Sequence, residues 1–385
     1  MSAPLPVPPP DAQAASHALC GCIADEIRAG GGWLSFARYM ELALYLPGLG
    51  YYAGGRRKFG EGGDFTTAPE LTPLFGQALA RQIAQVMAVS APVVLEAGAG
   101  SGRLAADLLK ALDRLGATPD HYLILELSGE LRTRQRETIE REAPSLSGRV
   151  EWLDRLPESF SGCVIANELL DAMPVHAVAW RKEGLMERGV VLDEGNRFAW
   201  SERPAPPFLV AVSAELTLAE PFESEIGLVA RAWVSEWGRR LTKGALLLID
   251  YGLPRHELYH PQRNRGTLRC HYRHRSHDDP FWWPGLSDIT AHVDFTAIAE
   301  AGFEAGLDVL GYTNQSTFLM NCGIGDLLEE RRCEAGDAAA LRAGNAASVL
   351  LSPGEMGELF KAIALGRGLT DPLSGFARGD RVYAL

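Results

Sequence analysis

The chain has 385 residues, 46% of them hydrophobic, and carries a formal charge of −12 at pH 7. A chain of this length builds one large domain or two. The negative charge argues against a nucleic-acid partner, because no run of basic residues compensates for it. No run of about 18 apolar residues occurs, so the sequence predicts no membrane span. The six cysteines are scattered, which favours reduced thiols in a reducing compartment.

The first ten residues are rich in proline and carry no basic residue. They lack the basic start and apolar core of a signal peptide, and also the arginines of a mitochondrial leader. We therefore expect a cytoplasmic, bacterial-type protein in which residues 1–15 are disordered.

Residues 16–90 predict an N-terminal helical cap. Apolar periodicity predicts a helix over residues 16–29, and Pro73 is placed to open another. The stretches 46–52 and 59–70 are rich in glycine and predict irregular backbone. Because this segment precedes the first strand of the expected sheet, it can lie across a ligand site as a lid. The alternative is a layer that packs under the sheet.

Residues 93–102, with the sequence VVLEAGAGSG, predict a buried strand and a Gly-rich turn, and the leucines that follow predict a helix. The third glycine of a dinucleotide-binding turn would stand where Arg103 is, and no Gly-Lys-Ser/Thr sequence follows as in a P-loop. The remaining pattern, Glu-x-Gly-x-Gly-x-Gly, resembles motif I of class I methyltransferases, which bind S-adenosyl-L-methionine. The alternative is a turn that only packs a helix on a sheet.

Carboxylates after neighbouring strands favour a nucleoside ligand without phosphate. The predicted strand over residues 121–126 ends in Glu126, where a carboxylate can accept hydrogen bonds from both ribose hydroxyls. Glu96 ends the strand before it. Asp154 follows a short third strand and is placed to meet an adenine amino group, or else to act as a carboxylate that caps a turn.

Residues 162–166 predict a fourth buried strand that leads into Asn167 and Glu168. In open α/β sheets, ligands bind beyond the carboxyl ends of the strands. Both side chains are therefore expected near the reacting group if this strand borders the first. The alternative for Glu168 is a carboxylate that only fixes the loop.

Two segments interrupt the α/β pattern. Alternating residues over 175–181, 185–192 and 197–200 predict an antiparallel β-meander. Residues 255–295 are rich in arginine, histidine and tryptophan. His271, His274 and His277 have a spacing at which imidazoles can bind zinc. Because arginines lie among them and oppose a cation, we expect no metal.

Five stretches in order along the chain resemble the MidA-like methyltransferase family, which includes the mitochondrial complex I assembly arginine methyltransferase and its bacterial relatives. They are residues 48–52, 63–70, 96–102, 167–175 and 288–295. The resemblance implies an α/β fold with a class I methyltransferase core, a Rossmann-like sheet of seven mostly parallel strands with helices on both faces. We expect this core over residues 91–385, with insertions at about 175–222 and 255–295.

The resemblance also implies a methyltransferase that uses S-adenosyl-L-methionine and releases S-adenosyl-L-homocysteine, with a protein arginine as the expected acceptor. The residues expected to bind the cofactor are Thr66, Thr67, Glu96, Gly98, Ala99, Gly100, Gly102, Glu126, Leu127 and Asp154. Those expected to be catalytic are Asn167, Glu168 and Asp171, and those expected to bind the acceptor are Asp288, His292 and Asp294.

The expected partner is a protein substrate, and the mitochondrial relative suggests a respiratory complex I subunit. The chain is expected to be a monomer or a homodimer. Two alternatives remain open. One is a small-molecule methyltransferase, since this core hosts many acceptors. The other is a non-catalytic assembly factor that keeps the fold, for which Trp282 and Trp283 would form a partner patch if exposed.

Overall fold

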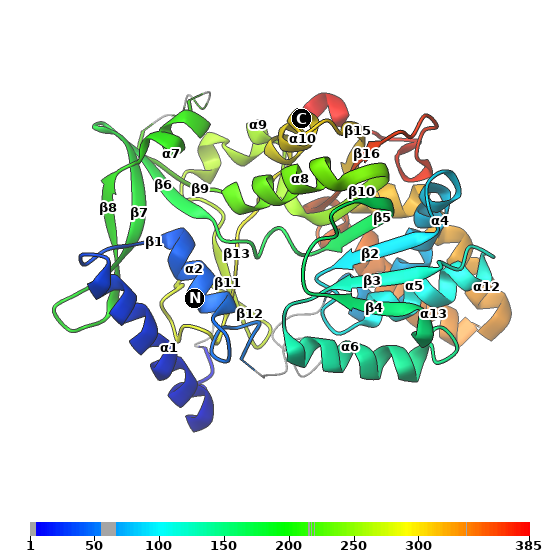
Figure 1. Ribbon diagram of the computed structural model, residues 1–385, viewed down its shortest axis with the longest axis horizontal. Coiled ribbons are helices and arrows are strands. Elements are labelled where there is room, and N and C mark those ends of the chain that lie inside the picture. Colours follow the sequence, from blue (N-terminus) through cyan, green and yellow to red (C-terminus); the bar gives the residue numbers. More distant parts are fainter. Residues whose placement is uncertain (1–4, 55–66, 215, 217, 219, 336) are drawn as a thin grey trace. The chain divides into compact units, whose positions relative to one another are not determined.

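The computed structural model describes residues 5–54, 67–214, 216, 218, 220–335 and 337–385 (Figure 1). The chain forms two compact units. Unit 1 comprises Met1–Phe65, Asp171–Ala230 and Arg255–Asp294, and unit 2 comprises Thr66–Leu170, Arg231–Pro254 and Phe295–Leu385. Within the described ranges, no helix has the length and apolar character needed to cross a membrane.

Unit 2 is built on a sheet whose main path has the strand order β15-β16-β10-β5-β2-β3-β4. The strands from β10 to β4 pair in parallel, and β16 is antiparallel to both of its neighbours. The strands are β2 (Val93–Ala97), β3 (His121–Leu125), β4 (Val150–Leu153), β5 (Phe160–Asn167), β10 (Leu241–Leu253), β15 (Asp308–Asn314) and β16 (Phe360–Arg367). The predicted fold class, a mostly parallel α/β sheet, is confirmed, and so is the expectation that the fourth strand borders the first.

Helices cover both faces of this sheet, because successive side chains of a buried strand point to opposite faces and both sets are apolar. Val94, Ile165 and Leu247 belong to the core that also contains residues of α4 and α5. On the other face, Gly302 of α10 lies against Leu365. The helices are α3 (Ala68–Leu71), α4 (Pro73–Val89), α5 (Arg103–Arg114), α6 (Gly129–Glu142), α8 (Leu228–Arg240), α10 (Phe295–Glu304), α11 (Gln315–Asn321), α12 (Ile324–Ala335), α13 (Asp337–Leu351) and α14 (Met356–Leu359).

Unit 1 contains the predicted antiparallel meander, which is formed by β6, β7 and β8. Its first sheet has the order β1-β7-β6-β9, with β8 paired to β7, and its second has the order β12-β11-β13. The strands are β1 (Leu34–Ser35), β6 (His176–Arg181), β7 (Gly184–Leu192), β8 (Phe198–Pro204), β9 (Phe222–Ile226), β11 (Arg269–Tyr272), β12 (Arg275–His277), β13 (Asp288–Thr290) and β14 (Val293–Asp294), and the helices are α1 (Pro10–Ala29), α2 (Phe36–Tyr45), α7 (Pro207–Val212) and α9 (Arg255–Leu258).

The N-terminal segment differs from the expectation of disorder. Helix α1 begins at Pro10, so residues 10–15 are helical, while residues 1–4 lie outside the described part of the chain. Proline is preorganised for the first helical position. Ala12 is buried in a small cluster against which Trp282 and Trp283 pack, so the two tryptophans are partly buried within unit 1.

The expected cap does not form one body. The compact units divide residues 16–90 after Phe65, and α4 packs into the core of unit 2. The apolar face of α4 is therefore a layer against the parallel sheet, as in the alternative that the sequence left open.

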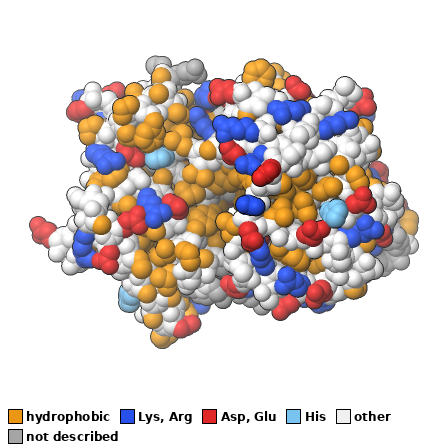
Figure 2. Space-filling view, in the orientation of Figure 1, with side chains coloured by type: hydrophobic (Ala, Val, Ile, Leu, Met, Phe, Trp, Pro, Cys, Tyr) orange, Lys and Arg blue, Asp and Glu red, His pale blue; other side chains and the backbone are white. Residues whose placement is uncertain are grey.

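The described surface carries charges of both signs. On the face that Figure 2 shows, Lys and Arg side chains are interspersed with Asp and Glu. The charges drawn on this face, which belong to described residues, therefore form no single-sign field of the kind that steers a polyanion.

Gly244 is the position where the parallel sheet depends most directly on the absence of a side chain. Its φ is 132°, and a Cβ there would overlap the carbonyl oxygen of Gly162 on the neighbouring strand. We expect Gly244→Ala to lower the free energy of unfolding by about 2–4 kcal/mol, through strain and a broken strand contact. Urea unfolding followed by circular dichroism measures this change.

The matched control is Gly344→Ala in the middle of α13, in the same unit, where a Cβ would meet nothing within 4 Å. Alanine favours a helix over glycine, so this variant should be as stable as the wild type or about 0.5–1 kcal/mol more stable. Equal unfolding midpoints for the two variants would contradict the role assigned to Gly244.

Candidate active site

The Gly-rich turn after β2 has a backbone that favours glycine. Gly98, Gly100 and Gly102 have φ values of 73°, 51° and 81°. A Cβ at Gly98 would lie 2.8 Å from the Leu169 side chain, and one at Gly102 would lie 2.8 Å from the Cα of Gln135. The turn is thus packed closely between α6 and the segment that follows β5, and side chains at Gly98 and Gly102 would collide with these neighbours.

Glu126 follows β3, and its carboxylate is held in place by neutral donors. Oε1 accepts a hydrogen bond from the backbone N–H of Ser128 at 2.8 Å, and Oε2 accepts one from Gln135 Nε2 at 3.1 Å. Burial raises the pKa of this carboxyl, and these hydrogen bonds oppose the rise. The carboxylate is therefore preoriented at the carboxyl edge of the sheet.

Gln135 connects three parts of this edge. Its Nε2 also donates to the carbonyl oxygen of Gly100 at 3.2 Å, and its Oε1 accepts from Trp152 Nε1 at 2.9 Å. Gln135 is fully buried. Sequence reasoning missed this residue, because a single glutamine in a strongly charged helix gives no signal of its own.

Glu96 lies inside the protein. Its side chain is buried, and Oε2 accepts a hydrogen bond from the Tyr122 hydroxyl at 2.6 Å. Burial raises the pKa of Glu96 to about 7, and the tyrosine hydrogen bond opposes the rise. The carboxylate thus points toward β3, and its role as a cofactor ligand stays a prediction.

Asp154 follows β4 and is exposed. Its Oδ1 lies 2.6 Å from Nη2 of Arg132, and this arginine also donates from Nε to the carbonyl oxygen of Glu126. The arginine thus connects the segments that follow β3 and β4.

The other residues predicted at the cofactor differ in exposure. Leu127 is 78% exposed, while Ala99 is buried in the Gly-rich turn. Thr67 directly precedes α3. Thr66 lies outside the residues that the structure describes.

Glu168 directly follows β5 and has a left-handed backbone, with φ 51°. Its Oε1 accepts hydrogen bonds from the backbone N–H of Ala68 at 3.2 Å and from Asn167 Nδ2 at 3.0 Å. A non-glycine residue in this region is strained, and strain of this kind concentrates at functional sites. Oδ1 of Asn167 is buried without a hydrogen-bond partner among the described residues.

Asp250 on β10 fixes the turn that carries Glu168. Its Oδ2 accepts from the backbone N–H groups of Leu169 and Leu170 at 3.1 and 2.8 Å. The Asp250 side chain is buried. The sequence gives no reason to connect Asp250 with Glu168, which lies far earlier in the chain.

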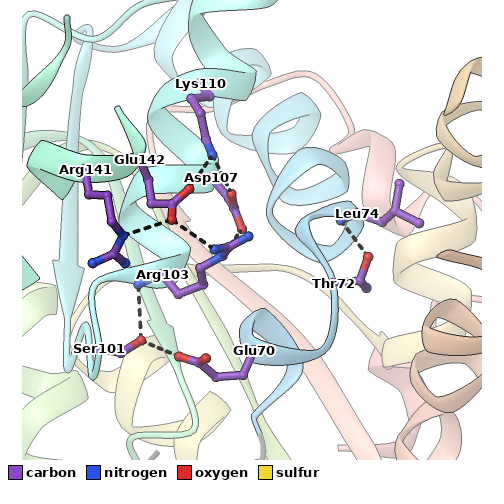
Figure 3. A network of polar contacts seen from close by, with 9 residues as sticks. All are labelled: Glu70, Thr72, Leu74, Ser101, Arg103, Asp107, Lys110, Arg141 and Glu142. Atoms are coloured by element: carbon purple, nitrogen blue, oxygen red, sulfur yellow. Dashed lines mark hydrogen bonds and ion pairs between the residues drawn. The ribbon is translucent and has the colours of Figure 1, made fainter. Parts of the chain in front are cut away.

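The short helix α3 contacts both the Gly-rich turn and Glu168. Ala68 at its start donates to the Glu168 carboxylate, and Glu70 near its end accepts a hydrogen bond from the Ser101 hydroxyl. Figure 3 shows this second contact, and it shows that Ser101 also accepts a hydrogen bond from the backbone N–H of Arg103 at 3.3 Å.

Asp171 belongs to unit 1, although it follows Glu168 closely in the chain. Its carbonyl oxygen accepts a hydrogen bond from the N–H of Ala291 at 3.0 Å. Unit 1 therefore brings Asp171 together with the 288–294 segment, which carries the residues expected to bind the acceptor.

Each of those three residues has a contact within unit 1. Asp288 accepts from the Tyr52 hydroxyl at 3.0 Å, and the Asp294 carboxylate lies 3.7 Å from the Arg255 guanidinium. The N–H of His292 donates to a threonine hydroxyl at 3.0 Å. Their roles toward an acceptor stay predictions.

The part of the chain that the structure describes holds no group of three or more His, Cys, Asp or Glu residues able to bind a metal ion. Nε2 of His277 is bonded to Ser287 Oγ at 3.1 Å. Burial lowers the pKa of both His271 and His277, so these imidazoles stay neutral to a lower pH than exposed ones.

The edge of unit 2 fits S-adenosyl-L-methionine. The Gly-rich turn has no room for side chains at Gly98 and Gly102, and the Glu126 carboxylate is oriented to accept hydrogen bonds from hydroxyl groups. Asn167 Oδ1 is a buried acceptor that lacks a partner among the described residues. A carboxylate-rich edge suits a sulfonium cofactor that has ribose hydroxyls and no phosphate.

Comparisons with known proteins agree with a site for S-adenosyl-L-methionine. The sequence model of a family described as S-adenosyl-L-methionine-dependent methyltransferases matches residues 78–313. The chain is 32% identical over 371 residues to protein arginine methyltransferase NDUFAF7, mitochondrial, of Mus musculus, covering 87% of this chain and 81% of the relative. The protein of that name from Danio rerio is 30% identical over 366 residues, covering 86% and 82%.

A solved structure resembles the whole chain. It is a superfamily member from Burkholderia thailandensis bound to S-adenosyl-homocysteine, 52% identical, with a TM-score of 0.96 and coverage of 99% of this chain and 100% of that chain. The chain belongs to this family of S-adenosyl-L-methionine-dependent methyltransferases, and S-adenosyl-L-methionine is its cofactor. The predicted family and cofactor are confirmed.

Gln135→Leu tests whether this glutamine supports the cofactor site. The substitution removes the donor to Gly100 and Glu126 and the acceptor of Trp152, while keeping a side chain of similar size. We expect the dissociation constant of S-adenosyl-L-homocysteine to rise about ten- to a hundredfold, since hydrogen bonds at the cradle are lost. Isothermal titration calorimetry measures it. Thr133→Leu on the exposed side of the same helix is the control, and equal affinities of the two variants would contradict this role.

Glu96→Gln tests whether burial raises the pKa of the Glu96 carboxyl group. The folded-state pKa is about 7 against an ordinary value of 4.5, so between these values the folded state holds more protons than the unfolded state. The contribution of this group to the free energy of unfolding is therefore full below about pH 4.5 and falls by up to about 3 kcal/mol as pH rises through 7.

Glutamine does not titrate, so Glu96→Gln should gain about 1–3 kcal/mol relative to the wild type between pH 5 and pH 8. Urea unfolding at both pH values measures this gain. A stability difference that is the same at both pH values would refute the raised pKa.

Proposed function

We propose that the protein is a protein-arginine N-methyltransferase in which Glu168 holds the guanidinium group of the acceptor. The observation that carries the proposal is the strained Glu168 at the carboxyl end of β5, directly beside the strand that leads into the Gly-rich turn. The names of the Mus musculus and Danio rerio relatives support the choice of arginine as acceptor.

The chemistry explains why a carboxylate belongs at this position. When bound, S-adenosyl-L-methionine supplies an electrophilic methyl group on its sulfonium. The acceptor nitrogen must be aligned with that group, which is a matter of positioning. A carboxylate that pairs with a guanidinium through two hydrogen bonds fixes its plane and orientation. Glu168 supplies this carboxylate, and Asn167 orients it through the 3.0 Å hydrogen bond from its amide.

The cofactor roles follow from the same edge. In the proposal, the glycines and Ala99 of the Gly-rich turn form the backbone cradle for the cofactor, and Glu126 accepts hydrogen bonds from the ribose hydroxyls. The remaining contacts proposed are with Thr66, Thr67, Glu96, Leu127 and Asp154.

For the acceptor, Asp171 is proposed as a further catalytic residue, and Asp288, His292 and Asp294 are proposed to bind the peptide. Carboxylates suit an arginine-bearing peptide because they complement its positive charge. The first acceptor to test is a respiratory complex I subunit, as the family resemblance suggests, and a cytoplasmic location is part of the same proposal.

Glu168→Gln keeps the shape of the side chain and removes its charge. We expect methyl transfer to fall at least about a hundredfold, while the affinity for S-adenosyl-L-homocysteine changes less than about threefold, because the acceptor is misaligned and the cofactor is still bound. Transfer of labelled methyl groups from S-adenosyl-L-methionine to cell-extract proteins measures turnover, and mass spectrometry of the labelled protein identifies the modified residue.

Glu183→Gln, at the exposed turn between β6 and β7, serves as the control and should retain full turnover. Near wild-type methylation by Glu168→Gln would exclude the proposed role of Glu168. If a small molecule is labelled and no protein is, the acceptor is a metabolite and the proposed protein acceptor is excluded.

A further inference from the structure

We propose that Glu70 binds the ammonium group of the amino-acid end of S-adenosyl-L-methionine. The inference deepens the proposed function, because it rests on the cofactor arrangement proposed above, with the ribose at Glu126 and the methyl group near Glu168. Thr66 and Thr67 of this segment are among the residues that the family resemblance leads us to expect at the cofactor, and Glu70 is not.

The position of Glu70 depends on two contacts of α3. At the start of the helix, the N–H of Ala68 donates to Glu168 at 3.2 Å. Near its end, the Glu70 carboxylate accepts a hydrogen bond from the hydroxyl of Ser101, which lies in the Gly-rich turn. Glu70 therefore lies at the turn itself, on a helix that is also bonded to the proposed catalytic residue.

The neighbouring arginine does not neutralise Glu70 in the contacts of the described residues. In Figure 3, Glu70 is joined to Ser101, whereas Arg103 points toward Asp107 and Glu142. Arg103 lies 3.1 Å from Asp107 and 3.7 Å from Glu142. Because those carboxylates engage the arginine, the carboxylate of Glu70 keeps its capacity to accept further hydrogen bonds from a cation.

The other glutamates around the turn have different tasks. Glu96 is buried against Tyr122. Glu126 is oriented for the ribose by its two neutral donors. Glu168 lies beyond β5, where the methyl group is expected. The amino-acid end of the cofactor carries an ammonium group that needs an acceptor, and an ionised carboxylate makes the strongest hydrogen bonds to it.

Two ligands that differ in the amino-acid end test the proposal. S-adenosyl-L-homocysteine carries the ammonium group, whereas 5′-methylthioadenosine has the same nucleoside and a thioether but lacks the amino-acid end. In Glu70→Gln, we expect the dissociation constant of S-adenosyl-L-homocysteine to rise about ten- to a hundredfold, because a charge-assisted hydrogen bond is lost. That of 5′-methylthioadenosine should change less than about twofold. Calorimetry serves for the first ligand and ligand-observed NMR titration for the second.

Two further variants keep the test decisive. Glu142→Gln removes a carboxylate of the neighbouring charge group and should leave both affinities within about twofold of the wild type. Glu70→Asp retains the charge and should recover part of the lost affinity for S-adenosyl-L-homocysteine. If Glu70→Gln does not fold, the same two ligands are titrated into Glu70→Asp. Its affinity for S-adenosyl-L-homocysteine should then fall more than its affinity for 5′-methylthioadenosine, by a smaller factor than expected for Glu70→Gln.

An equal loss for both ligands would overturn the inference, since Glu70 would then act through the shape of the turn. Unchanged binding of S-adenosyl-L-homocysteine would overturn it as well. Failure of the wild-type protein to bind S-adenosyl-L-homocysteine would instead refute the cofactor arrangement on which the inference rests, so the two failures are distinguishable.

Discussion

The parallel pairing of β2 with both β3 and β5 is the constraint on which the candidate site depends. In the ladders, Ala97 is level with Leu125 on one side and with Ala166 on the other. Three strands therefore end at the same edge, and the residues that follow them meet there. Register alone brings together the Gly-rich turn, Glu126 and the Asn167–Glu168 pair, although they are far apart in the chain.

Neutral groups donate hydrogen bonds to the carboxylates at this edge. Glu126 accepts from a backbone N–H and a glutamine amide, Glu168 from a backbone N–H and an asparagine amide, and Glu70 from a serine hydroxyl. Neutral donors of this kind orient a carboxylate and favour its charged form. Carboxylates suit a sulfonium cofactor and a guanidinium acceptor because the charges are complementary.

Much of this edge could be predicted from the sequence, because its signals are local. Glycine spacing after an apolar strand, and acidic residues at strand ends, depend only on neighbouring residues in the chain. Gln135 and Asp250 could not be predicted, since their roles arise from tertiary contacts with distant segments. The start of α1 was also missed, because the proline-rich composition suggested disorder, whereas Pro10 opens a helix.

The carboxylates of one sheet edge are thus expected to divide the contacts to the cofactor among themselves. The most direct measurement of this division is a crystal structure of the protein with S-adenosyl-L-homocysteine bound. We predict the ribose hydroxyls within hydrogen-bonding distance of Glu126, and the sulfur between the Gly-rich turn and Glu168. A ribose bound elsewhere, with Glu126 bonded to Ser128 and Gln135 alone, would contradict the proposed arrangement.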